Sequence, residues 1–369
     1  MENKKIHMRA STRKKILILS GMLIAFIILE VLLNIPGAIS SQVKGLLVPI
    51  CYNIILAVSL NLTVGILGDL SLGHAGFMCV GAFVGAFLSK YIGIVAPDMP
   101  EALSLLIAFL FGGLFAALFG VLVGIPVLRL HGDYLAIVTL AFGEIIWNVF
   151  QSVSVARDSN GLHFSLGTGS ISGLQADAET IVNGAQGISG FGRISGNSVG
   201  FAIAFGLAFV SVWLVLNLIH SRTGRAVKAI RDNRIAAESV GINIKKYKLL
   251  IIVVSAFFAG IAGVLYSHST GLFQATQSDY GYIMSINILV FVVLGGMSST
   301  LGSMIAAIVL TILPEMLRFL KDYRLLIYAV VLIGMMLFRS NPTLKNFTDS
   351  IKMKIKSLFA KKKGSAENG

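Results

Sequence analysis

The chain has 369 residues, of which 56% are hydrophobic and 13% are charged, and its mean hydropathy is +0.85. This composition excludes an ordinary soluble protein of this length and indicates helices that cross a membrane. The net charge of +13 does not indicate a nucleic-acid-binding protein, because most basic residues lie in three blocks (4–15, 222–248 and 339–363), as the positive-inside rule expects of cytoplasmic segments.

The N-terminal segment combines a basic stretch, residues 1–15, with an apolar run at 16–33. This pattern predicts a cytoplasmic N-terminus followed by a membrane anchor. The sequence Ala-Ile-Ser at 38–40 resembles a signal-peptidase site, so a cleaved signal peptide is the alternative. We favour a retained helix because the run is longer than the usual signal core of about 7 to 15 residues.

Apolar runs predict an all-α fold, a polytopic transmembrane helix bundle of about ten spans that occupies residues 16–340. The runs are 16–33, 43–65, 71–93, 104–128, 133–150, 199–219, 248–268, 283–298, 300–318 and 324–338. Two of them, 71–93 and 283–298, are also consistent with re-entrant segments. Six spans separate the first two basic blocks and four separate the second from the third, so both termini, including the basic tail 341–369, are expected in the cytoplasm.

Two connections are long enough to form structure of their own. Residues 151–198 are rich in Gly and Ser and are expected outside the cytoplasm, whereas 222–248 are expected inside it. In the second segment small and apolar residues recur at helical spacing opposite charged ones, and Gly241 is a candidate helix C-cap. The apolar positions are Ala226, Ile230, Ala237 and Val240. The pattern fits a helix that docks on a soluble partner or, alternatively, a helix at the membrane surface.

Polar residues within the apolar runs are candidates for a translocation path, because polar groups in a bilayer are costly and usually line a cavity or pair with one another. The candidates are Asn53, Asn61, His74, Glu144 and Asn287. Glu144 is expected near the middle of the bilayer, since it lies about 16 Å along its span at 1.5 Å per residue. The alternative for the asparagines is an interhelical hydrogen bond, and for Glu144 a buried structural partner.

Small residues repeat every four positions at Gly81 and Gly85, and again at Gly120 and Gly124. Such ridges let neighbouring helices approach closely, so they predict tight packing. Motifs for nucleotide binding, hydrolysis or metal ligation are not found, so we expect neither an enzyme nor a resident cofactor or metal. Energy for transport must then come from a partner ATPase or an ion gradient.

Three ordered blocks resemble the LivM-type permeases of branched-chain amino-acid ABC transporters, a superfamily shared with ribose and nucleoside permeases. The first is LNLTVGILGDLSLGHAGFMCVGAF at 60–83, and the second is LRLHGDYLAIVTLAFGEII at 128–146. The third runs from GRAVKAIRDNRIAAESVGINIKKYKLL at 224–250 to ILVFVVLGGMSSTLGSMIAAIVLTILPEMLR at 288–318. A Ser- and Gly-rich stretch at about 154–180 departs from the family pattern, since it lengthens the face expected to meet a binding protein.

The resemblance implies half of a translocation pore in a bacterial cytoplasmic membrane. The expected partners are a second similar permease, two cytoplasmic ATPase subunits that bind the ATP, an extracytoplasmic substrate-binding protein and membrane lipid, with no nucleic acid. The implied ATPase-coupling residues are Arg231, Asp232, Ala236, Ala237, Glu238 and Gly241. The expected cargo is a branched-chain amino acid; alternatives are another small solute (urea, an amide, another amino acid, a sugar or a nucleoside) and a secondary transporter that uses Glu144.

Overall fold

The computed structural model describes residues 2–35, 40–130, 132–158, 161–167, 179–194 and 197–317, together with 327, 329, 330, 333 and 334. Residues Met1–Thr311 form one compact unit and Ile312–Gly369 a second one. The expected apolar run 324–338 and the candidate cleavage sequence at 38–40 lie largely outside the described residues, and the tail 341–369 lies wholly outside them.

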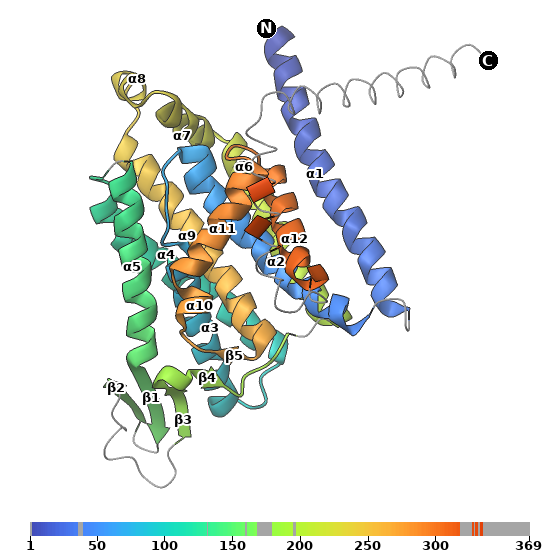
Figure 1. Ribbon diagram of the computed structural model, residues 1–369, viewed down its shortest axis with the longest axis vertical. Helices are drawn as coiled ribbons and strands as arrows, with labels where there is room; N and C mark the ends of the chain where they lie inside the picture. The colour runs from blue at the N-terminus through green and yellow to red at the C-terminus, as the bar shows by residue number, and fades with distance from the viewer. Residues whose placement is uncertain are drawn as a thin grey trace, which may run out of the picture. The chain divides into compact units, whose positions relative to one another are not determined.

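Long apolar helices dominate the first unit (Figure 1). They are α1 (Glu2–Asn34), α2 (Ser41–Asn61), α3 (His74–Val95), α4 (Glu101–Val127), α5 (Asp133–Ser152), α6 (Ser198–His220) and α9 (Ile244–Thr270), followed by α10 (Gln277–Tyr280) with α11 (Tyr282–Gly295). In the described part of the chain, eight helical segments are long and apolar enough to cross a membrane, and α12 (Thr300–Met316) is a shorter apolar helix. Each of the first nine predicted runs overlaps one of these helices, so the all-α bundle is confirmed and the protein is a multi-pass membrane protein.

Helix α9 packs against α2, α3 and α4. Both predicted glycine ridges face it. A Cβ atom added at Gly81 would lie 2.2 Å from the carbonyl oxygen of Gly260, and one at Gly85 would lie 2.7 Å from the side chain of Val264. The ridge on α4 meets α9 in the same way, at Ala256 and Leu249. These helices therefore approach closely because glycine leaves room, as the spacing predicted.

Short strands lie at one end of the bundle (Figure 1). Strands β1 (Val153–Asp158), β2 (Gly161–Leu166) and β3 (Glu179–Asn183) form an antiparallel sheet in the order β2-β1-β3. A 3₁₀ turn, η2 (Gly184–Gln186), leads to β4 (Ile188–Ser189), which pairs with β5 (Leu272–Phe273). The connection 151–198 thus has structure of its own, and β4 fastens it to the end of α9.

Helices α7 (Arg222–Asp232) and α8 (Arg234–Ser239) lie at the opposite end of the bundle, where α1 also begins (Figure 1). The basic stretch near the N-terminus and the basic connection after α6 therefore share one end. Between α2 and α3 the chain forms a π-helical turn, η1 (Leu62–Leu67), at the same end, and this turn contacts α7. The two long connections are separated by the length of the bundle.

Candidate functional site: the α7–α8 segment and the polar groups of the bundle

The segment after α6 forms two helices where the sequence predicted one. The side chain of Asn233 accepts a hydrogen bond from the backbone N–H of Ala236 at 3.0 Å and caps α8, while Ser221 caps α7 through the N–H of Gly224. Asn is a favoured N-cap, so it starts a new helix at this point and changes the direction of the chain. The single amphipathic helix was therefore wrong, because the helical register of α7 does not continue into α8.

The end of α8 confirms the predicted C-cap. Gly241 has φ +83°, a left-handed conformation that glycine adopts without steric cost. Its N–H donates to the carbonyl of Glu238, and the N–H of Ile242 donates to that of Ala237. This pair of bonds is the Schellman arrangement, which closes the helix and directs the chain back toward α9.

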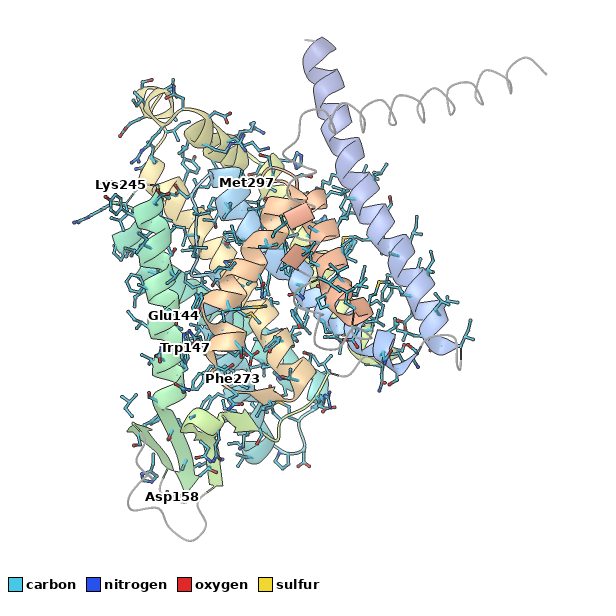
Figure 2. The ribbon with its side chains drawn as sticks, viewed as in Figure 1. Glu144, Trp147, Asp158, Lys245, Phe273 and Met297 are labelled. Atoms are coloured by element: carbon cyan, nitrogen blue, oxygen red, sulfur yellow. The ribbon has the colours of Figure 1, made fainter. Side chains whose placement is uncertain are left out.

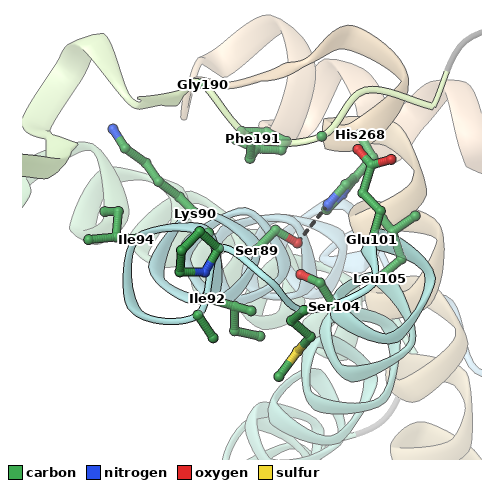
Figure 3. Close-up of a pocket in the computed structure, with 15 residues that line it drawn as sticks. Ser89, Lys90, Ile92, Ile94, Glu101, Ser104, Leu105, Gly190, Phe191 and His268 are labelled. Atoms are coloured by element: carbon green, nitrogen blue, oxygen red, sulfur yellow. Dashed lines mark hydrogen bonds between the residues drawn. The ribbon is translucent and has the colours of Figure 1, made fainter.

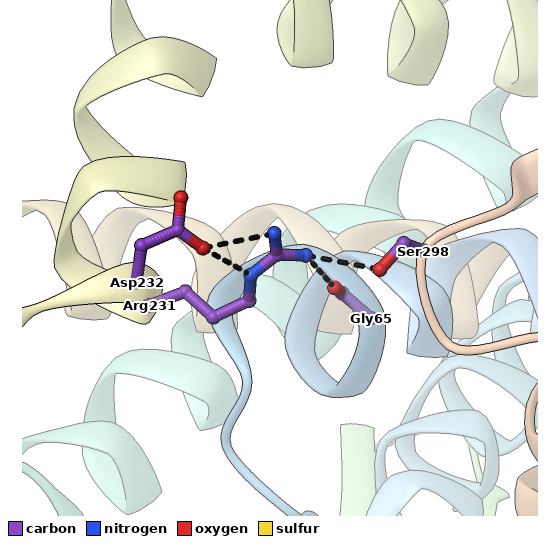
Figure 4. Close-up of polar contacts among 4 residues, drawn as sticks. All are labelled: Gly65, Arg231, Asp232 and Ser298. Atoms are coloured by element: carbon purple, nitrogen blue, oxygen red, sulfur yellow. Dashed lines mark hydrogen bonds and ion pairs between the residues drawn. The ribbon is translucent and has the colours of Figure 1, made fainter.

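Arg231 links α7 to the rest of the bundle (Figure 4). Its Nη1 donates to the backbone carbonyl of Gly65 in η1 and to Oγ of Ser298, each at 3.0 Å. Nε and Nη2 donate to Oδ1 of Asp232 at 3.2 and 3.0 Å. Its aliphatic part covers Gly68, where an added Cβ would lie 2.7 Å from Cγ of Arg231. The guanidinium thus joins three segments within the chain, namely α7, η1 and the turn before α12.

The outer surface of the α7–α8 segment is a small apolar patch among charges. Ile235 is 82% exposed and Val240 is 74% exposed. Ala236, Glu238 and the carboxylate of Asp232 are also exposed, whereas Ala237 is buried. The sequence had placed Ala237 and Val240 on one apolar face, but the structure separates them, because Ala237 is buried against the protein while Val240 is exposed. Sequence reasoning missed Ile235, although an isoleucine within a charged segment is a usable signal.

The predicted path residues occupy different surroundings, and no two of the five form a hydrogen bond with each other. His74 is buried, with its Nε2 2.8 Å from Oγ of Ser59. The hydroxyl of Ser59 donates to the carbonyl of Leu56, so it accepts from the imidazole. Beside His74 lies a cavity of about 20 Å³ whose lining includes Asp69. The carboxylate of Asp69 forms an ion pair with Lys248, and the charged atoms are 2.8 Å apart. The cavity volume admits about one water molecule and no amino acid.

Two of the asparagines lie on α2. Asn53 donates to Oγ1 of Thr311 at 3.0 Å, so an interhelical hydrogen bond is present there. Asn61 is fully buried beside η1, and within the described residues neither its amide nitrogen nor its oxygen has a hydrogen-bond partner. Asn287 is half-buried on α11. An unsatisfied buried amide is costly, so Asn61 is the strongest of these candidates for a group whose partner arrives in another state of the protein.

Glu144 acts as a structural partner in this conformation. One carboxylate oxygen accepts from the backbone N–H of Tyr282 at 2.7 Å, at the first turn of α11, and the other accepts from Nε1 of Trp147 at 2.8 Å (Figure 2). A carboxylate at a helix N-terminus satisfies a free N–H and interacts favourably with the helix dipole. One oxygen therefore links α5 to α11, while the other accepts a hydrogen bond within α5.

A larger cavity, of about 390 Å³, lies near the end of the bundle that carries the strands (Figure 3). Its polar lining includes Ser89, Lys90, Glu101, Ser104 and His268. His268 donates through Nδ1 to the carbonyl of Val264, so its Nε2 accepts from Ser89 at 2.9 Å. Sequence reasoning missed this cavity, because α3, α4, α9 and the loop at 190–192 each supply only a few of its residues.

A bundle of long apolar helices with two short, exposed helices at one end is consistent with a membrane transport subunit. The family described as branched-chain amino acid transport system / permease component matches residues 42–338. The chain belongs to this family, so it is a transport permease subunit.

Several curated relatives support the assignment. The chain is 31% identical over 314 residues to the high-affinity branched-chain amino acid transport system permease protein LivM of Escherichia coli (strain K12), covering 82% of this chain and 69% of that protein. It is 28% identical over 137 residues to the ribose import permease protein RbsC of the same strain (35% and 41% covered). It is 27% identical over 162 residues to the fructose import permease protein FruG of Bifidobacterium longum (43% and 47% covered). No solved structure matches the chain.

Proposed function

We propose that the chain forms half of the translocation pore of an ATP-driven importer for branched-chain amino acids in a bacterial cytoplasmic membrane. The second half is a similar permease subunit, two cytoplasmic ATPases bind and hydrolyse the ATP, and an extracytoplasmic protein delivers the substrate. The observation that carries this proposal is the likeness to LivM over 82% of the chain. The ribose and fructose permeases match over less than half of the chain, which favours an amino acid over a sugar as cargo.

The α7–α8 segment supports coupling to the ATPases. Ile235, Ala236 and Val240 offer an apolar contact that a groove on a soluble partner can bury, and Asp232 and Glu238 surround it with charge that fixes the orientation. Arg231 then carries the movement of α7 to η1, beside the unsatisfied Asn61. Closure of the ATPases would in this way change the packing around α2 and switch the accessible side of the pore.

The test is leucine uptake into proteoliposomes that contain the complete transporter, with ATP inside or outside, with and without a proton gradient. We expect uptake that requires ATP and the binding protein, that survives an ionophore, and that excess ribose does not compete with. Glu144→Gln is expected to retain most of this uptake, because the amide oxygen still accepts from Tyr282 and only the bond from Trp147 within α5 is lost. Uptake that persists without ATP, collapses with the proton gradient and is abolished by Glu144→Gln would instead establish a secondary transporter.

A further inference from the structure

A basic depression of about 340 Å³ lies at the end of the bundle that carries α7. Three basic side chains line it from three different helices: Lys15 on α1, His220 on α6 and Lys228 on α7. The turn before α12 adds the hydroxyl side chains of Ser298, Ser299 and Thr300, and none of the lining residues is acidic. Lysine ammonium groups and hydroxyl groups both donate hydrogen bonds to the oxygens of an oxyanion.

The positive charge of the lysines in this depression is not neutralised by an acidic side chain in its lining. Burial lowers the pKa of Lys228, and the neighbouring Arg231 lowers it further, while Asp232 opposes this effect. In the described part of the chain no side chain forms an ion pair or hydrogen bond with the ammonium of Lys228. The side chain of Lys15 donates to Oδ1 of Asn217, which is neutral and leaves other N–H groups available. A bound anion would therefore be stabilised.

The remaining lining is apolar and continuous with the exposed apolar side of α1. Leu17 and Ile18 on α1 and Leu216 on α6 line the same depression. Within the apolar part of α1, Lys15–Asn34, only Met22 and Leu33 are buried against the rest of the protein. Lys15 stands where that apolar part begins, the level at which lipid headgroups lie. The acyl chains of a lipid bound here can therefore extend along α1.

We propose that this depression binds the phosphate of an anionic phospholipid, with its acyl chains along α1. The same turn holds Arg231, whose Nη1 donates to Ser298 at 3.0 Å. An occupied site would therefore steady the contact between α7 and the bundle, and the lipid composition of the membrane would influence coupling. This inference concerns a lipid and does not depend on the cargo or on the ATPases.

Native mass spectrometry of the purified full-length chain tests the proposal, with phosphatidylglycerol and phosphatidylcholine of the same acyl chains as probes. Wild type is expected to prefer phosphatidylglycerol. The double variant Lys15→Gln/Lys228→Gln is expected to lose about 25-fold in affinity, from about fivefold per lysine. Its matched control is Lys245→Gln/Lys246→Gln, which removes the same charge at the start of α9, away from the turn at Met297 (Figure 2). Lys15→Arg/Lys228→Arg keeps the charge and is expected to keep the lipid.

A second variant distinguishes a loss of lipid binding from misfolding of the protein. Ser299 accepts from the N–H of Gly302 at 3.0 Å and caps α12. Ser299→Asp keeps a favoured cap while placing a negative charge beside the phosphate, so it should fold and release the lipid. Undiminished phosphatidylglycerol binding by Ser299→Asp, an equal loss in the lysine control, or no preference between the two lipids would overturn the proposal. Displacement of the lipid by inorganic phosphate, beyond the effect of chloride at equal ionic strength, would assign the site to free phosphate instead.

Discussion

Gly81 and Gly260 bring the backbones of α3 and α9 into direct contact in the centre of the bundle. Side chains at these positions would overlap backbone atoms, which cannot move aside without separating the helices. Gly263 makes a similar contact, since an added Cβ would lie 2.0 Å from the carbonyl oxygen of Met78. Single residues with no chemical function thus set the distance between α9 and α3, the helix that begins at His74.

We expect Gly81→Leu to lower the thermal stability of the purified protein strongly, by about 2 kcal/mol or more, because overpacking against backbone cannot be relieved by a rotamer change. Gly93→Leu is the matched control on the same helix, as an added Cβ there meets nothing within 4 Å. The measurement is the melting temperature in detergent. Equal melting temperatures for the two variants would contradict the close approach of α3 and α9.

At the scale of elements, the segment α7–α8 is bonded to the bundle on its inner side and exposes apolar side chains on its outer side. The inner link is Arg231, which is bonded to Gly65 and Ser298. The outer surface consists mainly of Ile235 and Val240, which the break at Asn233 turns away from the bundle. A segment built in this way can bind a partner on one side and transmit its movement on the other.

Val240→Asp is expected to leave the fold intact and to reduce retention of the ATPase subunits roughly tenfold, because the contact would then bury an unpaired carboxylate in place of an apolar side chain. Val199→Asp at the start of α6 is the control, since Val199 is similarly exposed and lies at the other end of the bundle. Co-purification of the subunits in a mild detergent measures the effect. Full retention of the ATPases by Val240→Asp would remove this surface from the coupling contact.

At the scale of the whole molecule, the strands and the α7–α8 segment lie at opposite ends of the bundle (Figure 1). The basic residues of α7 and the first turns of α9 belong to one end, and the sheet that follows α5 belongs to the other. From the positive-inside rule we predict that the basic end lies in the cytoplasm. The sheet is then predicted to lie on the opposite side of the membrane.

Labelling of intact cells with a membrane-impermeant thiol reagent checks this orientation. Cys51 and Cys79 are both buried, so they give little background. A cysteine at Phe164, whose side chain is 70% exposed on β2, should react in intact cells. One at Ser239, which is exposed at the end of α8, should react only after the cells are permeabilised. The reverse pattern would invert the proposed topology.

The sequence predicted the features that depend on local composition. Hydropathy indicates each span because a bilayer requires a continuous apolar stretch, and the glycine ridges predicted close packing because their spacing follows the helix period. Gly241 was identified as a cap from its position after a helical pattern. The family resemblance likewise depends on ordered blocks of residues, and the family match confirmed it.

The tertiary structure alone decided which polar groups have partners. Glu144 gains the N–H of Tyr282, which is distant in the sequence, while Asn61 is left without a partner among the described residues. Ile235 and Val240 become a surface only because Asn233 starts a new helix, and the depression at Lys15 and Lys228 exists only because α1, α6 and α7 meet. Spans are determined by the chain's own interaction with lipid, whereas sites are determined by contacts between segments that the sequence does not reveal.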